Sequence, residues 1–144
     1  MLSKKQARAF FLGGTVVTFL IFIGLTVFSL SKAQDQTNIN DLTESAIRGK
    51  ELWEKNNCMG CHTLLGEGGY YAPELTKVIE RRGPSYIKTV LKSEKPWAPR
   101  GRKMVAYNMS DEEANDMVAF FEWIGKIDLN GFETIVSPLA NDED

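Results

Sequence analysis

The chain has 144 residues, of which 17 are basic and 19 acidic, and its formal net charge at pH 7 is −2. This length allows one domain and a short additional segment, and the charge balance gives no indication of nucleic-acid binding. The part from Ala33 onward contains 13 of the basic and all 19 of the acidic residues, so its net charge is −6.

The first predicted element is a transmembrane helix over residues 9–30. This run contains no charged residue, and its 22 residues would span about 33 Å as a helix, enough for the ~30 Å hydrocarbon core of a bilayer. A cleaved signal peptide is the alternative, but its apolar region would be only about 7–15 residues long. Lys4, Lys5 and Arg8 precede the run. By the positive-inside rule they place residues 1–8 in the cytoplasm and the rest on the periplasmic side of a bacterial inner (cytoplasmic) membrane.

A polar linker over residues 31–40 is expected to lead into a helical domain over residues 41–128. The first helix of this domain is predicted to begin near Asp41, because Glu44 follows three residues later in a capping-box-like arrangement. It would run toward Lys55.

Gly49 lies inside this predicted helix, four residues before Trp53. A glycine in a helix interior costs about 1 kcal/mol relative to alanine, so it predicts a packing requirement. We expect a second helix to cross closely at this point; the alternative is a tolerated glycine beside a core tryptophan.

The two cysteines and the single histidine of the chain form one motif, Cys58-Met-Gly-Cys61-His62. This spacing is typical of covalent c-type haem attachment, in which the two thiols add to the haem vinyl groups and the histidine binds the iron. Bis-histidine ligation within the chain is excluded, because there is no second histidine. A methionine as the sixth ligand would raise the potential and suit electron transfer.

Three other uses of the motif fit less well. A redox dithiol is expected in a thioredoxin-like βαβ setting, and no strand pattern is visible. A structural zinc site needs four ligands, and the motif supplies three. A disulfide between such close cysteines would be a poor cross-link.

The remaining pattern predicts a mainly α domain with the element order of a class I cytochrome c. A glycine-rich loop over residues 64–75 follows the haem motif, and short helices are expected over 74–81 and 85–91, separated by Gly83-Pro84. An extended loop over 96–104 precedes a last helix that begins with a capping box of Ser110 and Glu113. Its predicted buried stripe is Ala114, Met117, Val118, Phe121 and Ile124. Residues 129–144 are expected to form a mobile tail.

Met104 is the favoured sixth ligand, because its irregular loop can bring the sulfur across the haem opposite His62. Met109 is the alternative, although its place before the last helix suits a hydrophobic staple. The other three methionines are not expected to bind the iron. Met117 belongs to the apolar stripe, Met59 lies in the attachment turn, and Met1 would lie across the membrane.

The chain resembles one family over nearly its whole length. The matching stretches are residues 48–53, 57–75, 81–83, 98–104, 108–113 and 121–128. On these residues the chain is similar to the small cytochrome c subunit (NorC) of bacterial cytochrome-c-dependent nitric oxide reductase. The loop 64–75 is far more specific for the family than the haem motif. One departure from the family is Val105, which stands where a proline is usual.

The resemblance implies a haem c electron-transfer subunit without a catalytic centre of its own. Its partner would be a large subunit with haem b, haem b3 and non-haem iron, where two NO, two electrons and two protons become N2O and water. The electron donor would be a small soluble cytochrome c or cupredoxin. The family's axial ligands correspond to His62 and Met104. Its calcium, shared with the large subunit, corresponds to the backbone around Gly68 and Tyr70, and carbonyl oxygens suit such a hard cation.

The loop 66–71 follows the haem motif directly, so we expect it near the haem rim. Tyr70 and Tyr71 can bury area at an interface while hydrogen-bonding; the alternative is that they only cover the haem. We therefore expect this loop to pack on the large subunit, with the donor on another part of the rim. The net charge of −6 favours a basic donor.

Two other functions compete with this one. A membrane-anchored cytochrome c could serve another terminal reductase or oxidase. A haem-based gas sensor would need a signalling domain, and nothing resembling one follows the haem motif.

Overall fold

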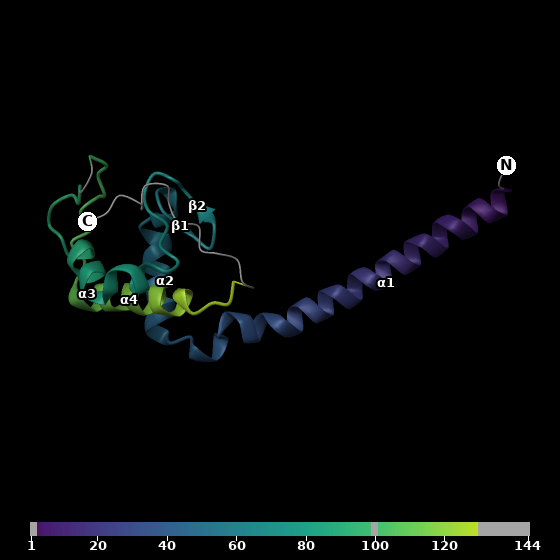
Figure 1. Cartoon of the computed structure of the whole chain (residues 1–144), viewed down its shortest axis with the longest axis horizontal. Coiled ribbons are helices and arrows are strands. Elements are labelled where there is room, and N and C mark those ends of the chain that lie inside the picture. Colours follow the sequence, from purple (N-terminus) through teal and green to yellow (C-terminus); the bar gives the residue numbers. More distant parts are fainter. Residues whose placement is uncertain (1–2, 99–100, 130–144) are drawn as a thin grey trace. The chain divides into compact units, whose positions relative to one another are not determined.

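The structure is a computed structural model that describes residues 3–98 and 101–129. The chain divides into two units, Met1–Thr37 and Asn38–Asp144, and the described part is mainly helical (Figure 1). Most of the predicted tail, residues 130–144, lies outside the described residues, as does Met1.

The first unit contains a single helix, α1 (Lys4–Thr37), of 34 residues. Within the described residues it is the one helix long and apolar enough to cross a membrane. The hydroxyl groups of Thr15, Thr18 and Thr26 donate to carbonyl oxygens of their own helix, at 2.8, 2.9 and 2.8 Å, so these polar groups are satisfied without water. Residues 31–37, predicted as linker, continue the helix because they contain no glycine or proline.

The second unit begins with a short 3-10 helix, η1 (Ile39–Asp41), followed by α2 (Glu44–Lys55). The predicted helix start near Asp41 is therefore wrong. Thr43 is the N-cap, and its side-chain oxygen accepts a hydrogen bond from the Ala46 amide at 3.1 Å. Threonine and aspartate have the same capping chemistry, so composition alone did not distinguish them.

Two small elements follow α2. The 3-10 helix η2 (Cys58–Gly60) carries the first cysteine. The strands β1 (Thr63–Leu64) and β2 (Glu67–Gly68) then pair antiparallel, with Thr63 opposite Gly68. The two-residue strands are too short to leave an alternating pattern in the sequence.

The helix α3 (Val78–Leu91) contains a kink at Gly83, where the backbone has φ 76° and ψ 161°. The predicted break at Gly83-Pro84 is thus present, but the first part of the helix begins at Val78 instead of residue 74. Only glycine adopts this backbone conformation without strain, and the proline ring clashes with the preceding turn.

The last helix, α4 (Asp111–Gly125), has the predicted capping box. The Ser110 hydroxyl accepts from the Glu113 amide at 3.2 Å, and the Glu113 carboxylate accepts from the Ser110 amide at 2.9 Å. All five residues of the predicted stripe are buried. Phe120 and Asp116, which the pattern did not include, are buried as well.

The helices α2 and α4 cross at Gly49 with their backbones in contact. A β-carbon on Gly49 would lie 2.1 Å from the carbonyl oxygen of Asp116 and 2.7 Å from the β-carbon of Phe120. These separations are shorter than any non-bonded contact, so the residue must be glycine at this approach. The predicted close crossing is confirmed.

A buried carboxylate ties the same two helices together. Asp116 on α4 accepts hydrogen bonds from the Nε and Nη2 atoms of Arg48, both at 2.8 Å, and from the Ser45 hydroxyl at 2.5 Å. The Arg48 guanidinium is the main reason that the pKa of Asp116 is lowered. Burial of this charge is tolerated because it is paired and hydrogen-bonded.

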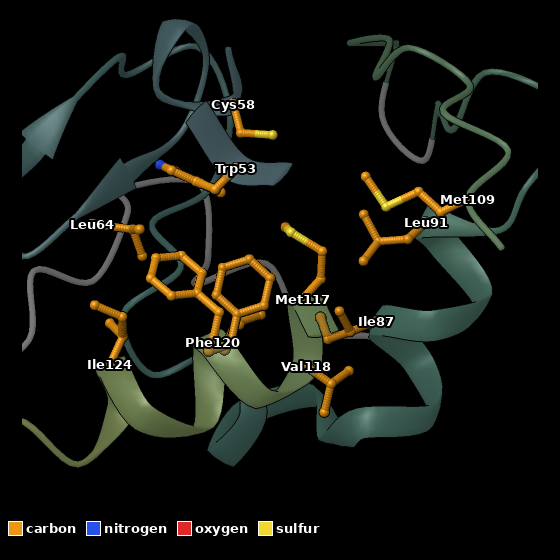
Figure 2. Packing of buried hydrophobic residues seen from close by; sticks show 12 residues of the cluster. Trp53, Cys58, Leu64, Ile87, Leu91, Met109, Met117, Val118, Phe120 and Ile124 are labelled. Atoms are coloured by element: carbon orange, nitrogen blue, oxygen red, sulfur yellow. The ribbon is translucent and has the colours of Figure 1, made fainter. Parts of the chain in front are cut away.

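One hydrophobic cluster joins α2, α3, α4 and the cysteine segment (Figure 2). Trp53 is its centre on α2, with ring centroids 6.2 Å from Phe120 and 5.7 Å from Phe121. The other buried members are Cys58, Leu64, Val78, Ile87, Leu91, Met109, Met117, Val118 and Ile124. The core therefore reaches the first cysteine of the motif.

The Gly49→Ala variant should be destabilised by about 1–3 kcal/mol, because its methyl group must push the two backbones apart. At an open helix position the same substitution would stabilise the helix by about 1 kcal/mol. A loss of stability therefore indicates the close crossing. Urea unfolding midpoints measure it. Glu51→Ala, an exposed change on the same helix, is the control and should leave the midpoint almost unchanged. Equal midpoints for wild type and both variants would contradict the close crossing.

Candidate functional site

The cysteines and the histidine lie on one tight turn at the end of α2. Asn57 has φ 50°, a left-handed conformation that asparagine adopts more readily than most residues. The amides of Cys61 and His62 both donate to the Cys58 carbonyl, at 3.2 and 2.9 Å. This turn carries both cysteines and the histidine within five consecutive residues. Cys58 is buried and Cys61 is exposed.

His62 is oriented by a backbone carbonyl. Its Nδ1 atom lies 2.8 Å from the carbonyl oxygen of Pro73. Because that oxygen can only accept, Nδ1 carries the hydrogen and Nε2 keeps its lone pair. Burial lowers the pKa of His62, an effect that the Pro73 carbonyl opposes. The imidazole is therefore held neutral, with one nitrogen available to a metal.

The glycine-rich loop packs onto the turn itself. A β-carbon on Gly68, whose φ is 122°, would lie 2.2 Å from the His62 carbonyl oxygen, and one on Gly69 would lie 2.4 Å from that of Gly60. The Gly69 amide also donates to the Met59 carbonyl at 2.8 Å, and the Ala72 amide donates to the Cys61 carbonyl at 2.9 Å. These glycines allow the loop to hold the motif backbone, a role that the sequence alone did not indicate.

Glu74 and Thr76 anchor the far end of this loop. The Glu74 carboxylate accepts from the Thr76 amide at 2.6 Å and from Arg81 at 3.3 Å. The Thr76 hydroxyl accepts from the Leu65 amide at 2.7 Å. Glu74 and Thr76 are 5% and 2% exposed, and this network keeps Pro73 within reach of His62. A buried glutamate is rarely foreseen from sequence, because its partners are distant or backbone groups.

The methionines have different environments. Met104 is half-buried against the core, and its backbone pairs with that of Trp97. Met109 and Met117 are 6% and 1% exposed and belong to the core, whereas Met59 is 42% exposed. Figure 2 shows Met109 and Met117 directed into the same cluster as Cys58.

Tyr107 is a neighbour of the site that no sequence motif indicated. Its hydroxyl donates a hydrogen bond to the Asn56 carbonyl oxygen at 3.5 Å and faces the Cys58 thiol. Burial raises the pKa of Cys58, which the Tyr107 hydroxyl opposes.

Tyr70 and Tyr71 are 70% and 49% exposed. The Arg102 guanidinium lies 5.3 Å from the centre of the Tyr71 ring and donates a hydrogen bond to the Tyr71 carbonyl. The loop 66–71 thus contacts the segment that carries Met104, while Tyr70 exposes most of its area to solvent.

Comparisons with known proteins agree with this chemistry. The sequence model of the Cytochrome c family matches residues 46–124. The C subunit of the nitric oxide reductase of Stutzerimonas stutzeri is 43% identical over 133 residues, covering 89% of this chain and 91% of that protein. The proteins of the same name from Halomonas halodenitrificans and Paracoccus denitrificans are 40% and 39% identical, each over 88% of this chain and 91% of the relative.

Proposed function

The chain belongs to the cytochrome c family and to its branch of small nitric oxide reductase subunits (NorC), and on this premise we propose that it is the haem c electron-transfer subunit of a nitric oxide reductase. The observation that carries the proposal is the turn with Cys58, Cys61 and His62, in which the Pro73 carbonyl leaves one imidazole nitrogen available. The chain would take electrons from a soluble donor and pass them to a catalytic subunit.

The donor set fits a covalently held haem. Cys58 and Cys61 would form the two thioether bonds, and His62 and Met104 would bind the iron. When bound, the haem supplies an iron that alternates between its ferric and ferrous forms. The chain's own residues hold the imidazole in one tautomer, position the methionine loop and enclose the first thiol in the core.

Catalysis belongs to the partner in this proposal. The partner would be the large membrane subunit, with haem b, haem b3 and non-haem iron, that reduces NO to N2O.

The anchor would place the haem domain on the periplasmic side of the bacterial inner membrane. Lys4, Lys5 and Arg8 precede the apolar run and support a cytoplasmic amino terminus. The soluble donor would then approach from the periplasm.

The exposed loop 66–71 is proposed as the docking surface for the large subunit. Tyr70 supports this, since most of its large side chain is exposed. A calcium ion could be shared there through backbone oxygens of Gly68 and Tyr70. The loop has one carboxylate, Glu67, and calcium takes about six to eight oxygen ligands, so the large subunit would complete the site.

The axial ligand is tested with Met104→Ala. This variant should lose the methionine–iron charge-transfer band at the red end of the visible spectrum and have a lower potential, because a thioether ligand raises it. Met109→Ala is the matched control and should keep both properties. Haem should stay with both polypeptides after denaturation and acid extraction. If Met109→Ala loses the band and Met104→Ala keeps it, the ligand is misassigned.

Topology is tested by fusing a reporter after Asp144. A reporter that works only outside the cytoplasm should be active, because the basic residues precede the span. Activity of a cytoplasm-only reporter at the same position would reverse the orientation.

The function and the docking surface are tested together on the purified complex. The wild-type chain should copurify with one large membrane subunit that contains non-haem iron, and Tyr70→Ala should weaken this association or slow internal electron transfer. Reduction by the donor, followed by stopped flow, should be unchanged in the variant and should slow as salt rises.

Ile47→Ala, which removes an exposed apolar side chain from α2, is the control for this experiment. Gly68→Val is unsuitable, because its side chain would strike the His62 carbonyl. If Tyr70→Ala assembles fully and loses only donor reduction, the loop faces the donor. If the wild-type chain copurifies with no large subunit, the proposed function is wrong.

A further inference from the structure

The backbone of Met104 is paired with that of Trp97. The Trp97 amide donates to the Met104 carbonyl at 3.2 Å, and the Met104 amide donates to the Trp97 carbonyl at 2.8 Å. These reciprocal bonds form an isolated antiparallel bridge outside any described strand. The position of the Met104 backbone therefore follows that of Trp97.

Trp97 is in turn fixed to a helix. Its ring packs edge-on against Tyr86 of α3, with a centroid separation of 6.0 Å and an interplanar angle of 89°. The Arg82 guanidinium lies 5.5 Å from the centre of the Tyr86 ring. Edge-to-face aromatic pairs are attractive because the positive edge of one ring meets the negative face of the other, and the guanidinium adds a cation–π contact.

The segment between α3 and α4 has no helix of its own in its described residues. On one side of Met104 it is attached by the Trp97–Tyr86 contact. On the other side Tyr71 contacts the Arg102 guanidinium and accepts a hydrogen bond from the Lys103 amide at 3.4 Å. Of these residues, only Trp97 is hydrogen-bonded directly to the Met104 backbone. A loop without regular structure needs such an anchor, because ordering each residue costs about 1–2 kcal/mol.

We propose that Trp97, held by Tyr86, is a positioning residue that keeps the Met104 sulfur within bonding distance of the haem iron. This inference rests on the proposed function, in which Met104 is the sixth ligand. Loss of the Trp97–Tyr86 contact would leave the fold in place but free the loop, so that the sixth position of the iron would open more often.

The test uses the full haem-loaded chain and added imidazole, which binds iron only when the sixth position is open. Losing an aromatic pair should raise the apparent imidazole affinity of Trp97→Leu by about 2- to 10-fold, and that of Tyr86→Leu similarly. Trp97→Phe keeps an aromatic ring facing Tyr86 and should restore the wild-type affinity. The methionine–iron band of the leucine variants should weaken in parallel.

Trp123→Leu is the matched control. This half-buried tryptophan on α4 donates from Nε1 to the Asn38 carbonyl at 3.2 Å and has no described contact with Met104. An equal rise in imidazole affinity in Trp123→Leu would show a general loosening of the fold and overturn the proposal. An unchanged affinity in Trp97→Leu would overturn it too.

The experiments distinguish an error in the choice of ligand from an error in the role of Trp97. If Met104→Ala retains the band, the choice of ligand is wrong. If Met104→Ala loses the band while Trp97→Leu keeps both the band and the wild-type imidazole affinity, Met104 is the ligand but Trp97 does not position it.

Discussion

Backbone contact between α2 and α4 at Gly49 is the constraint on which the rest of the second unit depends. Because no β-carbon fits there, Trp53 one turn later reaches Phe120 and Phe121, and Arg48 one residue earlier reaches Asp116. The helix α2 continues into the cysteine turn with only Asn56 and Asn57 between them. The crossing therefore fixes the point at which the segment with Cys58, Cys61 and His62 starts.

The site itself is assembled mainly by main-chain groups. The glycine loop closes on the carbonyls of Met59, Gly60 and His62, and a proline carbonyl selects the imidazole tautomer. Side chains act further out, where Glu74 and Thr76 hold the loop. Such an arrangement presents ligands from a backbone that is already ordered, which reduces the conformational entropy lost when a cofactor binds.

Features with local chemistry could be predicted from the sequence, and features made by distant carbonyls could not. The capping box of Ser110 and Glu113, the break at Gly83-Pro84 and the crossing at Gly49 each depend on residue types with restricted backbone preferences. The carbonyl acceptor for His62 and the carbonyl beside Gly68 cannot be recognised from residue types, since every residue has a carbonyl. The start of α2 was misplaced because Asp41 and Thr43 are both good caps.

The pairing of Arg48 with Asp116 joins positions 68 residues apart, and both cysteines lie between them. Synthesis proceeds from the amino terminus, so α2 lacks its contact with α4 until the last helix has been made. A contact of such long sequence separation requires a large loop to close, which costs conformational entropy. Cys58, which is buried in the folded domain, lies on the segment between the two helices and is enclosed only when they meet. The docking of α4 onto α2 is therefore the step after which Cys58 is enclosed in the core.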